Sequence, residues 1–478
     1  MPEHPFFCIL VYHCPSFKLE IGIGGGRIQK HQDDIMKTFF KAFPALLCLL
    51  SATFSAFAAE GDGKKSSGDF PSKIELTIAD SVDYALEGNL SIRQGNKTLE
   101  QKKRQMDYVW GTLIPSIRAS FSFSKAFTDS PSPATFSLGG SISLTLSPSI
   151  YTSVKSASLN YELQQLVYDA SVRAVEMNVR KVYYSLLYEK ENIALLQAAV
   201  DKAEAQYNSN LTKYNHGTLS SLDVLSSQNA LQNAKISLDA AKGSYEVDIA
   251  NFKLILGIPQ SCEIVLVGSL DDIMNLGDVN VNQVEGHTAS IANYEKQLEI
   301  AKNSLLATRF AAWGPSLNAG YSYSANGNTD TGLRSQNYGS ISLSVSIPLD
   351  GYLPRSSGGQ NIQNQITTIE NLEMDIENAK ATSAINIDGY RKQIKQCQDS
   401  ISLRKKSVNL AEQAYGMMAQ AYGRGTRDFM SLQNSLSQLQ QAQLGLKSDV
   451  LKLASVILEL ENAMGLPFGT LTDTVAEQ

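Results

Sequence analysis

Few residues in this 478-residue chain have the types and spacing that chemistry requires. Beyond residue 58 the histidines are His216 and His287, and neither stands beside a cysteine or carboxylate at metal-ligand spacing. We interpret His216 as a solvated turn residue. No HExxH pattern, nucleophile motif or phosphate loop occurs there, and the glycine-rich stretch 22–27 lacks the Lys-Ser/Thr ending of such a loop. The sequence therefore predicts no enzyme: no catalytic residue, no metal and no cofactor.

The cysteine content and the net charge argue against two further classes of protein, those stabilised by disulfides and those that bind nucleic acid. Cys262 and Cys397 are the only cysteines beyond residue 58, too few for a disulfide framework, and we expect Cys397 to be a core thiol on a helix. The formal net charge is −6 and no basic run stands out. Bulk charge thus predicts no nucleic-acid partner.

The N-terminal region resembles an export signal. Residues 36–58 combine a short basic start, the apolar core AFPALLCLLSATFSAF and the small residues Ala56 and Ala58 around a cleavage point. We therefore expect residues 1–35 to be an upstream leader outside the working protein, and the mature chain to begin near Ala59. PALLC lacks the small residues of a lipid-attachment motif. After Ala58 no apolar run of about 18 residues occurs, so a membrane-spanning helix is not predicted.

The mature chain contains one unit twice. At an offset of 208 residues, Gly217-Thr218 matches Gly425-Thr426, and GIP from Gly257 matches GLP from Gly465. At an offset of 200, PSIRASFSFS from Pro115 matches PSLNAGYSYS from Pro315. The first repeat is expected at 59–268, with strands at about 115–148 and a long helical hairpin at 151–257. The second is expected at 269–478, with strands at about 315–348 and a hairpin at 360–465.

The predicted helices have a coiled-coil period. Apolar residues recur at steps of three and four, as in Ile193, Leu196, Val200, Ala203 and Tyr207. So narrow a stripe buries a seam and not a globular core. A helix from Tyr151 to Tyr214 would reach roughly 95 Å, at 1.5 Å for each residue.

The predicted strands alternate strictly. Ile117, Ala119, Phe121 and Phe123 face one side while serines and Arg118 face the other. This pattern fits a transmembrane barrel with lipid outside and water inside, although a soluble sandwich would show it too. Four strands cannot close a barrel and an open edge is not tolerated in hydrocarbon, so either several chains share one barrel or the barrel prediction fails. We expect DSPSPATFSLGG and ANGNTDTGLRSQN to be hairpin loops.

These features together resemble one family. The opening LTIADSVDYALEGN, the Gly-Thr turns, SLDVLSSQNAL, and the helix ends LGIP and MGLP are similar to the TolC-type outer-membrane efflux proteins. The resemblance implies a long coiled-coil α-helical barrel and a transmembrane antiparallel β-barrel shared by a homotrimer, with four strands from each protomer. It also implies a location in outer-membrane lipid with a long periplasmic extension. The implied partners are a periplasmic adaptor (a membrane fusion protein) and an inner-membrane transporter.

The resemblance also implies site residues. The hairpin tips would dock the adaptor, and they comprise Gly217, Thr218, Leu219, Gly425 and Thr426. Any helical hairpin would use glycine at such a turn, however, so a purely structural role stays open.

A gate beside the tips is implied as well, with Asp223 bonded to Tyr422 and Arg427. Ser431 and Asn434 stand where the family has acidic residues that narrow the entrance, which leaves Asp428 as the acidic candidate.

The function implied is a passive, gated duct from periplasm to exterior, as the outer-membrane channel of a tripartite efflux or type I secretion system. Two alternatives remain open at this point: a periplasmic or secreted coiled-coil scaffold or adhesin without a channel, and an enzyme whose site is assembled from scattered polar residues. The duplicated strand pairs favour the conduit, because a scaffold would not need them. The sequence does not indicate the cargo.

Overall fold

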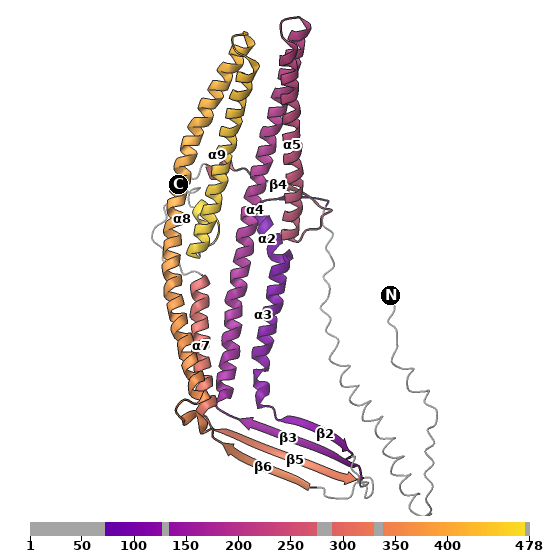
Figure 1. Cartoon of the computed structure of the whole chain (residues 1–478), viewed down its shortest axis with the longest axis vertical. Helices are drawn as coiled ribbons and strands as arrows, with labels where there is room; N and C mark the ends of the chain where they lie inside the picture. Colours follow the sequence, from indigo (N-terminus) through magenta and orange to yellow (C-terminus); the bar gives the residue numbers. More distant parts are fainter. Residues whose placement is uncertain (1–71, 127–132, 275–288, 329–337, 474–478) are drawn as a thin grey trace, which may run out of the picture. The chain divides into compact units, whose positions relative to one another are not determined.

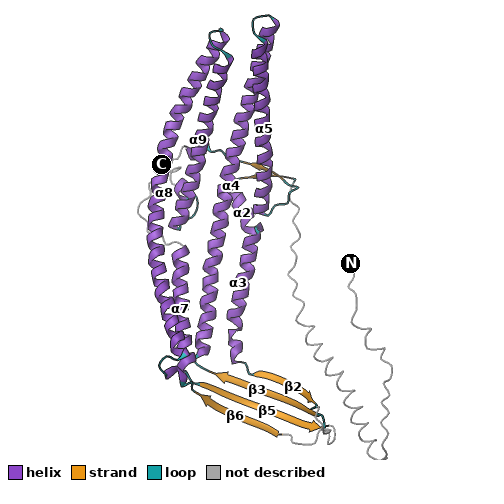
Figure 2. Ribbon diagram, viewed as in Figure 1, coloured by secondary structure: helices purple, strands orange, loops and turns teal. Residues whose placement is uncertain are grey.

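The computed structural model describes residues 72–126, 133–274, 289–328 and 338–473. The expected leader, the signal peptide and His287 lie outside these ranges. All described residues fall in one unit, Phe70–Gln478. Within that unit, helices dominate, and a four-stranded sheet continues from the ends of four of them (Figures 1 and 2).

Two pairs of helices have equal lengths. Helices α4 (Ser149–Asn215) and α8 (Ser357–Gly423) each have 67 residues, and α5 (Ser221–Leu256) and α9 (Phe429–Met464) each have 36. At 1.5 Å for each residue, α4 and α8 are each about 100 Å long. In the described ranges, no helix has both the length and the apolarity to cross a bilayer.

Shorter helices complete each half. The first half has α2 (Ile78–Gly88), α3 (Leu90–Tyr108), the 3-10 turn η2 (Val109–Leu113) and α6 (Asp271–Met274). The second has α7 (Ala289–Trp313), the 3-10 turn η3 (Asp350–Tyr352) and α10 (Thr470–Asp473). Helices α3 and α4 lie against each other, as do α7 and α8, and α4 also contacts α7 and α9.

The larger sheet is antiparallel, in the order β2-β3-β5-β6. Its strands are β2 (Ser116–Ser124), β3 (Thr135–Leu146), β5 (Ser316–Asn328) and β6 (Tyr338–Ser346). The register keeps the alternation across all four strands: Ile117, Ile142, Tyr321 and Ile341 form one row, and Arg118, Ser141, Ser322 and Ser340 the next. Because successive residues face opposite sides, one face is apolar and the other polar.

Strands β3 and β5 extend into the stretches that we expected to be loops. Thr135 pairs with Asn328, so DSPSPATFSLGG and ANGNTDTGLRSQN each contribute several residues to a strand. The loop prediction was wrong there because Gly and Asn suggested turns, while Phe136 and Leu138 continue the alternation. Residues 127–132 and 329–337 lie outside the description.

The coiled-coil stripe packs α4 against α5. Val200, Leu231 and Leu238 are buried together, with five flanking residues around them: Ile193, Leu196, Ala203, Tyr207 and Ala234. A larger core lies further from the turns, where Val179, Leu186, Phe252, Ile457 and Leu460 are buried. Burial along a seam supplies most of the stability of helices this long.

A small parallel sheet is anchored to α4. Strands β1 (Lys73–Leu76) and β4 (Glu263–Leu266) pair in parallel. The Tyr183 hydroxyl donates to the Leu76 carbonyl at 3.1 Å, and burial raises the pKa of Tyr183 to about 12. Lys447 of α9 contacts Glu191 of α4 at 2.8 Å and Asp271 at 2.9 Å, so the second hairpin is bonded to the first at this level.

Candidate functional site

The two hairpin tips have the same backbone structure. Gly217 has φ 71° and Gly425 has φ 74°, the left-handed conformation that favours glycine. Thr218 N donates to Lys213 O at 2.9 Å and Thr426 N donates to Ala421 O at 3.0 Å, which closes each long helix with a Schellman-type turn. A Cβ at either position would meet no atom within 4 Å. Glycine is therefore favoured there by the positive φ and not by a lack of space.

The remaining tip side chains cap the helices. The Thr218 and Thr426 hydroxyls each donate at 2.9 Å to the carbonyl that their own backbone N–H also contacts. Ser220 accepts from Asp223 N at the start of α5, and Asp428 accepts from Ser431 N at 2.8 Å at the start of α9. Chain reversal therefore accounts for Gly217, Thr218, Gly425 and Thr426 without a partner. Leu219 is half-buried.

Tyr422 bonds to a different residue from the one expected. Its hydroxyl donates to Asn210 Oδ1 at 2.7 Å, and Asn210 is fully buried on α4. Burial raises the pKa of Tyr422, and the nearby Asp223 carboxylate adds to that rise. Among the described residues, no hydrogen bond or ion pair joins Asp223 to Tyr422 or Arg427. Asp223 instead accepts from the Ser220 hydroxyl at 2.7 Å.

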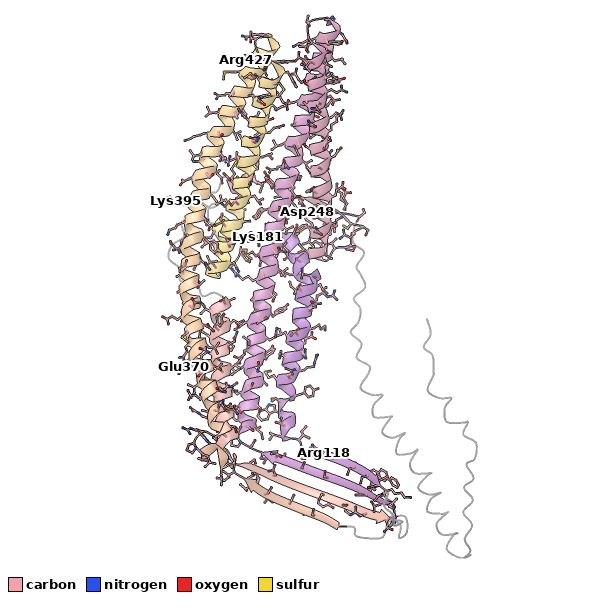
Figure 3. The ribbon with its side chains drawn as sticks, in the orientation of Figure 1. Arg118, Lys181, Asp248, Glu370, Lys395 and Arg427 are labelled. Atoms are coloured by element: carbon pink, nitrogen blue, oxygen red, sulfur yellow. The ribbon has the colours of Figure 1, made fainter. Side chains whose placement is uncertain are left out.

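Arg427 lies at the second tip (Figure 3), and both it and the neighbouring Asp428 are exposed. The hydrogen bonds from Ser431 lower the pKa of Asp428, with a smaller contribution from the Arg427 charge. The structure of one chain thus places three of the four expected gate residues at accessible positions, while Tyr422 is buried.

The surroundings of Tyr422 join the two hairpins. Its ring lies 6.2 Å from that of Phe429, Leu432 is buried with them, and Ala230 is among the residues that pack against this cluster. Ala230 belongs to α5, so residues of both hairpins meet here. Asn210 also accepts from Gln206 at 2.7 Å, and its own Nδ2 is buried without a partner among the described residues.

Sequence reasoning missed Asn210. It lies beside Leu211 in the apolar stripe that runs through Tyr207 and Tyr214. A polar residue within a coiled-coil seam commonly specifies a pairing, and this was the available signal.

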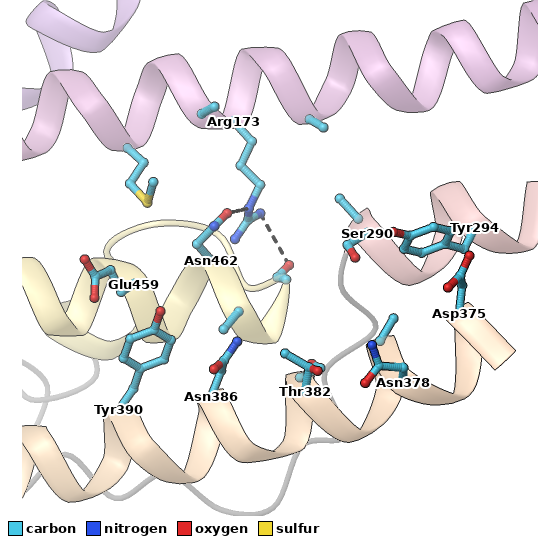
Figure 4. Close-up of a pocket in the computed structure, with 18 of the residues that line it drawn as sticks. Arg173, Ser290, Tyr294, Asp375, Asn378, Thr382, Asn386, Tyr390, Glu459 and Asn462 are labelled. Atoms are coloured by element: carbon cyan, nitrogen blue, oxygen red, sulfur yellow. Dashed lines mark hydrogen bonds between the residues drawn. The ribbon is translucent and has the colours of Figure 1, made fainter. Parts of the chain in front are cut away.

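A cavity of about 880 Å³ lies between α4, α7, α8 and α9 (Figure 4). The two basic residues in its lining, Arg173 and Lys181, are held in structural contacts. Arg173 Nε donates to Asn462 Oδ1 at 2.9 Å and another guanidinium nitrogen donates to Glu461 O at 2.8 Å, while Lys181 pairs with Glu459 at 2.7 Å. The described residues contain no group of three or more metal-binding side chains. We assign the cavity no catalytic role.

The comparisons with known proteins agree with this geometry. Residues 82–257 match the family model described as outer membrane efflux protein. The fold is similar to the CmeC outer membrane channel of Campylobacter jejuni, with a TM-score of 0.65 and 17% identity, covering 84% of this chain and 88% of that one. It is also similar to VceC of Vibrio cholerae, with a TM-score of 0.65 and 15% identity over 82% of this chain and 96% of that one.

A third similar structure is the open state of the Neisseria gonorrhoeae MtrE outer membrane channel. The TM-score is 0.61 and the identity 16%, over 81% of this chain and 89% of that one. No curated protein sequence matches the chain. The match of residues 82–257 to the outer membrane efflux protein model agrees with the family resemblance of the sequence, and the fold is shared with these solved structures over most of the chain.

Proposed function

We propose that this protein is the outer-membrane channel of a tripartite efflux or type I secretion system, and that it supplies a passive, gated duct from the periplasm to the exterior. The observation that carries the proposal is the four-stranded sheet, which has one apolar and one polar face and continues from the ends of helices about 100 Å long. The helices form the periplasmic extension and the sheet lies in the membrane.

The apolar face is exposed in the single chain. Ile117 on β2 is 78% exposed and Ile341 on β6 is 86% exposed, and both belong to the row that includes Ile142 and Tyr321. The opposite face is bonded by hydroxyl pairs such as Ser322 with Ser340 at 2.8 Å. In a barrel, the first face contacts lipid and the second lines a water-filled lumen.

Both edges of the sheet require partners. Strands β2 and β6 each pair on one side only among the described residues, and an unpaired edge is too costly in hydrocarbon. Strands β2 and β6 run in opposite directions. The β6 edge of one copy can therefore pair antiparallel with the β2 edge of the next copy. We place three copies in the assembly, as in the family resemblance, which gives a barrel of twelve strands.

The helices also have unpaired apolar stripes. Leu403, Leu410 and Met417 are exposed at intervals of seven residues on α8, and Ile236, Val247 and Leu254 are exposed on α5. Stripes of this spacing pack as coiled-coil seams, so neighbouring copies would close the helices into a tube. The equal lengths of α4 with α8 and α5 with α9 suit such a tube, because a duplicated unit supplies six similar hairpins.

The gate is proposed at the tips. The bond from Tyr422 to Asn210 holds the two hairpins of one copy together, while Asp223, Arg427 and Asp428 are available to neighbouring copies. The adaptor would dock at the turns of Gly217 to Leu219 and Gly425 to Thr426, where Leu222, Leu225 and Met430 are exposed. An inner-membrane transporter supplies the energy, because this chain has no nucleotide-binding motif.

Single-channel recording in planar bilayers tests the function. We expect the mature protein, residues 59–478, to give small conductance events, and an Asp223→Ala, Arg427→Ala double variant to give much larger ones. If the parent and the variant conduct equally, the charged gate is refuted, but the proposal that the protein forms a channel still holds. A protein that stays soluble without detergent and never inserts would favour the periplasmic scaffold.

A further inference from the structure

The chain passes between the helices and the four-stranded sheet at four places. Each of these crossings has an exposed aromatic residue. Tyr108 ends α3 before β2, Tyr151 begins α4 after β3, Trp313 ends α7 before β5, and Tyr352 lies in η3 between β6 and α8. Figure 2 shows that these crossings lie together at one end of the helices. Two of them are in contact, since Trp313 Nε1 donates to Gly351 O at 3.0 Å.

Each aromatic residue has a cation three or four positions away, always on the side remote from the strand. The pairs are Arg104 with Tyr108, Lys155 with Tyr151, Arg309 with Trp313, and Arg355 with Tyr352. In the three helical pairs, residues four apart share one face of the helix and the cation lies about 6 Å further along its axis, while Arg355 lies in the turn that precedes α8. All four cations are exposed and make no ion pair with a described residue.

The backbone at Arg355 adds a second observation. Arg355 has φ 63°, and it is the only residue other than glycine with a positive φ in the described part of the chain. An arginine is less stable in this left-handed conformation than in its usual backbone conformation.

The charge of this region contrasts with the rest of the molecule. The crossings, taken as residues 102–114, 149–157, 307–315 and 349–357, contain six lysines and arginines and two aspartates, a net charge of +4. The whole chain has a net charge of −6. The positive charge is therefore concentrated where the helices meet the sheet.

We propose that these four aromatic–cation pairs form a belt that binds the headgroups of anionic phospholipids in the membrane leaflet nearest the helices. The proposal rests on the proposed function, because the sheet must lie in a bilayer for its helical end to meet that leaflet. Aromatic rings prefer the boundary between hydrocarbon and water. Cations placed one turn beyond that boundary lie at the level of the phosphates, whose charge they complement.

The tryptophans provide a direct probe. The chain has two: Trp313 belongs to the belt, and Trp110 lies in η2, two residues after Tyr108 of the belt. We would reconstitute the mature protein in phosphatidylcholine vesicles that contain a small, equal fraction of spin-labelled phosphatidylglycerol or spin-labelled phosphatidylcholine. A contribution of about 1 kcal/mol from each cation corresponds to a roughly fivefold preference for the anionic lipid at each pair. Quenching by phosphatidylglycerol should exceed that by phosphatidylcholine severalfold and weaken at about 1 M salt.

Two variants with equal loss of charge make the test specific. Replacing Arg104, Lys155, Arg309 and Arg355 by Gln should bring the two quenchers to equal efficiency. Replacing four exposed lysines elsewhere on the helices should change nothing; these are Lys235, Lys242, Lys395 and Lys406.

Vesicle flotation and conductance separate the two proposals. If the protein floats and conducts but both lipids quench equally, or neither quenches, the belt is refuted and the channel remains. The belt is also refuted if both variants lose the preference to the same extent. A protein that neither floats nor conducts refutes the channel and the belt with it.

Discussion

Tyr422→Phe tests whether the bond between the hairpins holds the tip closed. The change removes the hydroxyl that Asn210 accepts at 2.7 Å and leaves the ring in place against Phe429 and Leu432. A buried neutral hydrogen bond contributes about 1 kcal/mol, so closure in one copy should weaken roughly fivefold. If three copies open together, the contributions add to about 3 kcal/mol and the open probability rises by a factor on the order of 100.

Single-channel open probability is the measurement, with Tyr415→Phe as the matched control. Tyr415 is half-buried on the same helix, seven residues earlier, and its hydroxyl makes no hydrogen bond with a described residue. The control should behave as the parent does. If Tyr422→Phe leaves the open probability unchanged, or if the two variants raise it equally, the bond to Asn210 does not hold the gate.

Three further predictions concern stability, each measured by thermal unfolding followed by circular dichroism. Gly425→Ala should destabilise the second tip by about 1–2 kcal/mol because alanine disfavours φ 74°, whereas Gly423→Ala, at the last residue of α8, should be neutral or stabilising; equal effects would argue against backbone strain. Glu461→Ala should cost roughly 2–5 kcal/mol because Gly469 N and Leu471 N lose their acceptor, and Glu459→Ala, which removes a partly exposed ion pair, should cost less. Burial and the neighbouring Asp248 carboxylate raise the pKa of Glu189 in the folded state, so stability should fall as pH rises through the interval from about 4.3 to that raised value. Glu189→Gln should flatten this dependence and raise the melting temperature at pH 7; an unchanged slope would refute the assignment.

The sequence predicted the parts of the fold that repeat with a simple period. Alternation in PSIRASFSFS indicated strands because one face of this sheet is apolar and the other polar, and the heptad stripe through Val200 indicated a seam because α4 packs against α5 along it. The two turn glycines were recognisable because a left-handed residue has few alternatives to glycine.

Long-range pairings could not be predicted in this way. Strands β1 and β4 have four residues each and lie far apart in the sequence, so neither shows a period. The acceptor for Tyr422 is another case, because Asn210 is 212 residues away and nothing local indicates which polar group it meets. The family resemblance implied Asp223 as the acceptor. The sequence alone does not show whether Asp223 or Asn210 lies within hydrogen-bond distance of the Tyr422 hydroxyl.

Disulfide cross-linking between the sheet edges tests the shared barrel most directly. Ser120→Cys on β2 would be combined in turn with Ser340→Cys, Ser342→Cys or Ser344→Cys on β6, in the mature protein inserted in membranes. The native Cys262 and Cys397 are buried, so they should contribute little background. The account predicts that at least one combination gives covalent dimers and then a closed trimer on oxidation, because paired edge strands bring Cα atoms within about 7 Å. Monomer alone in all three combinations, with the protein in the membrane, would contradict a barrel closed by neighbouring copies.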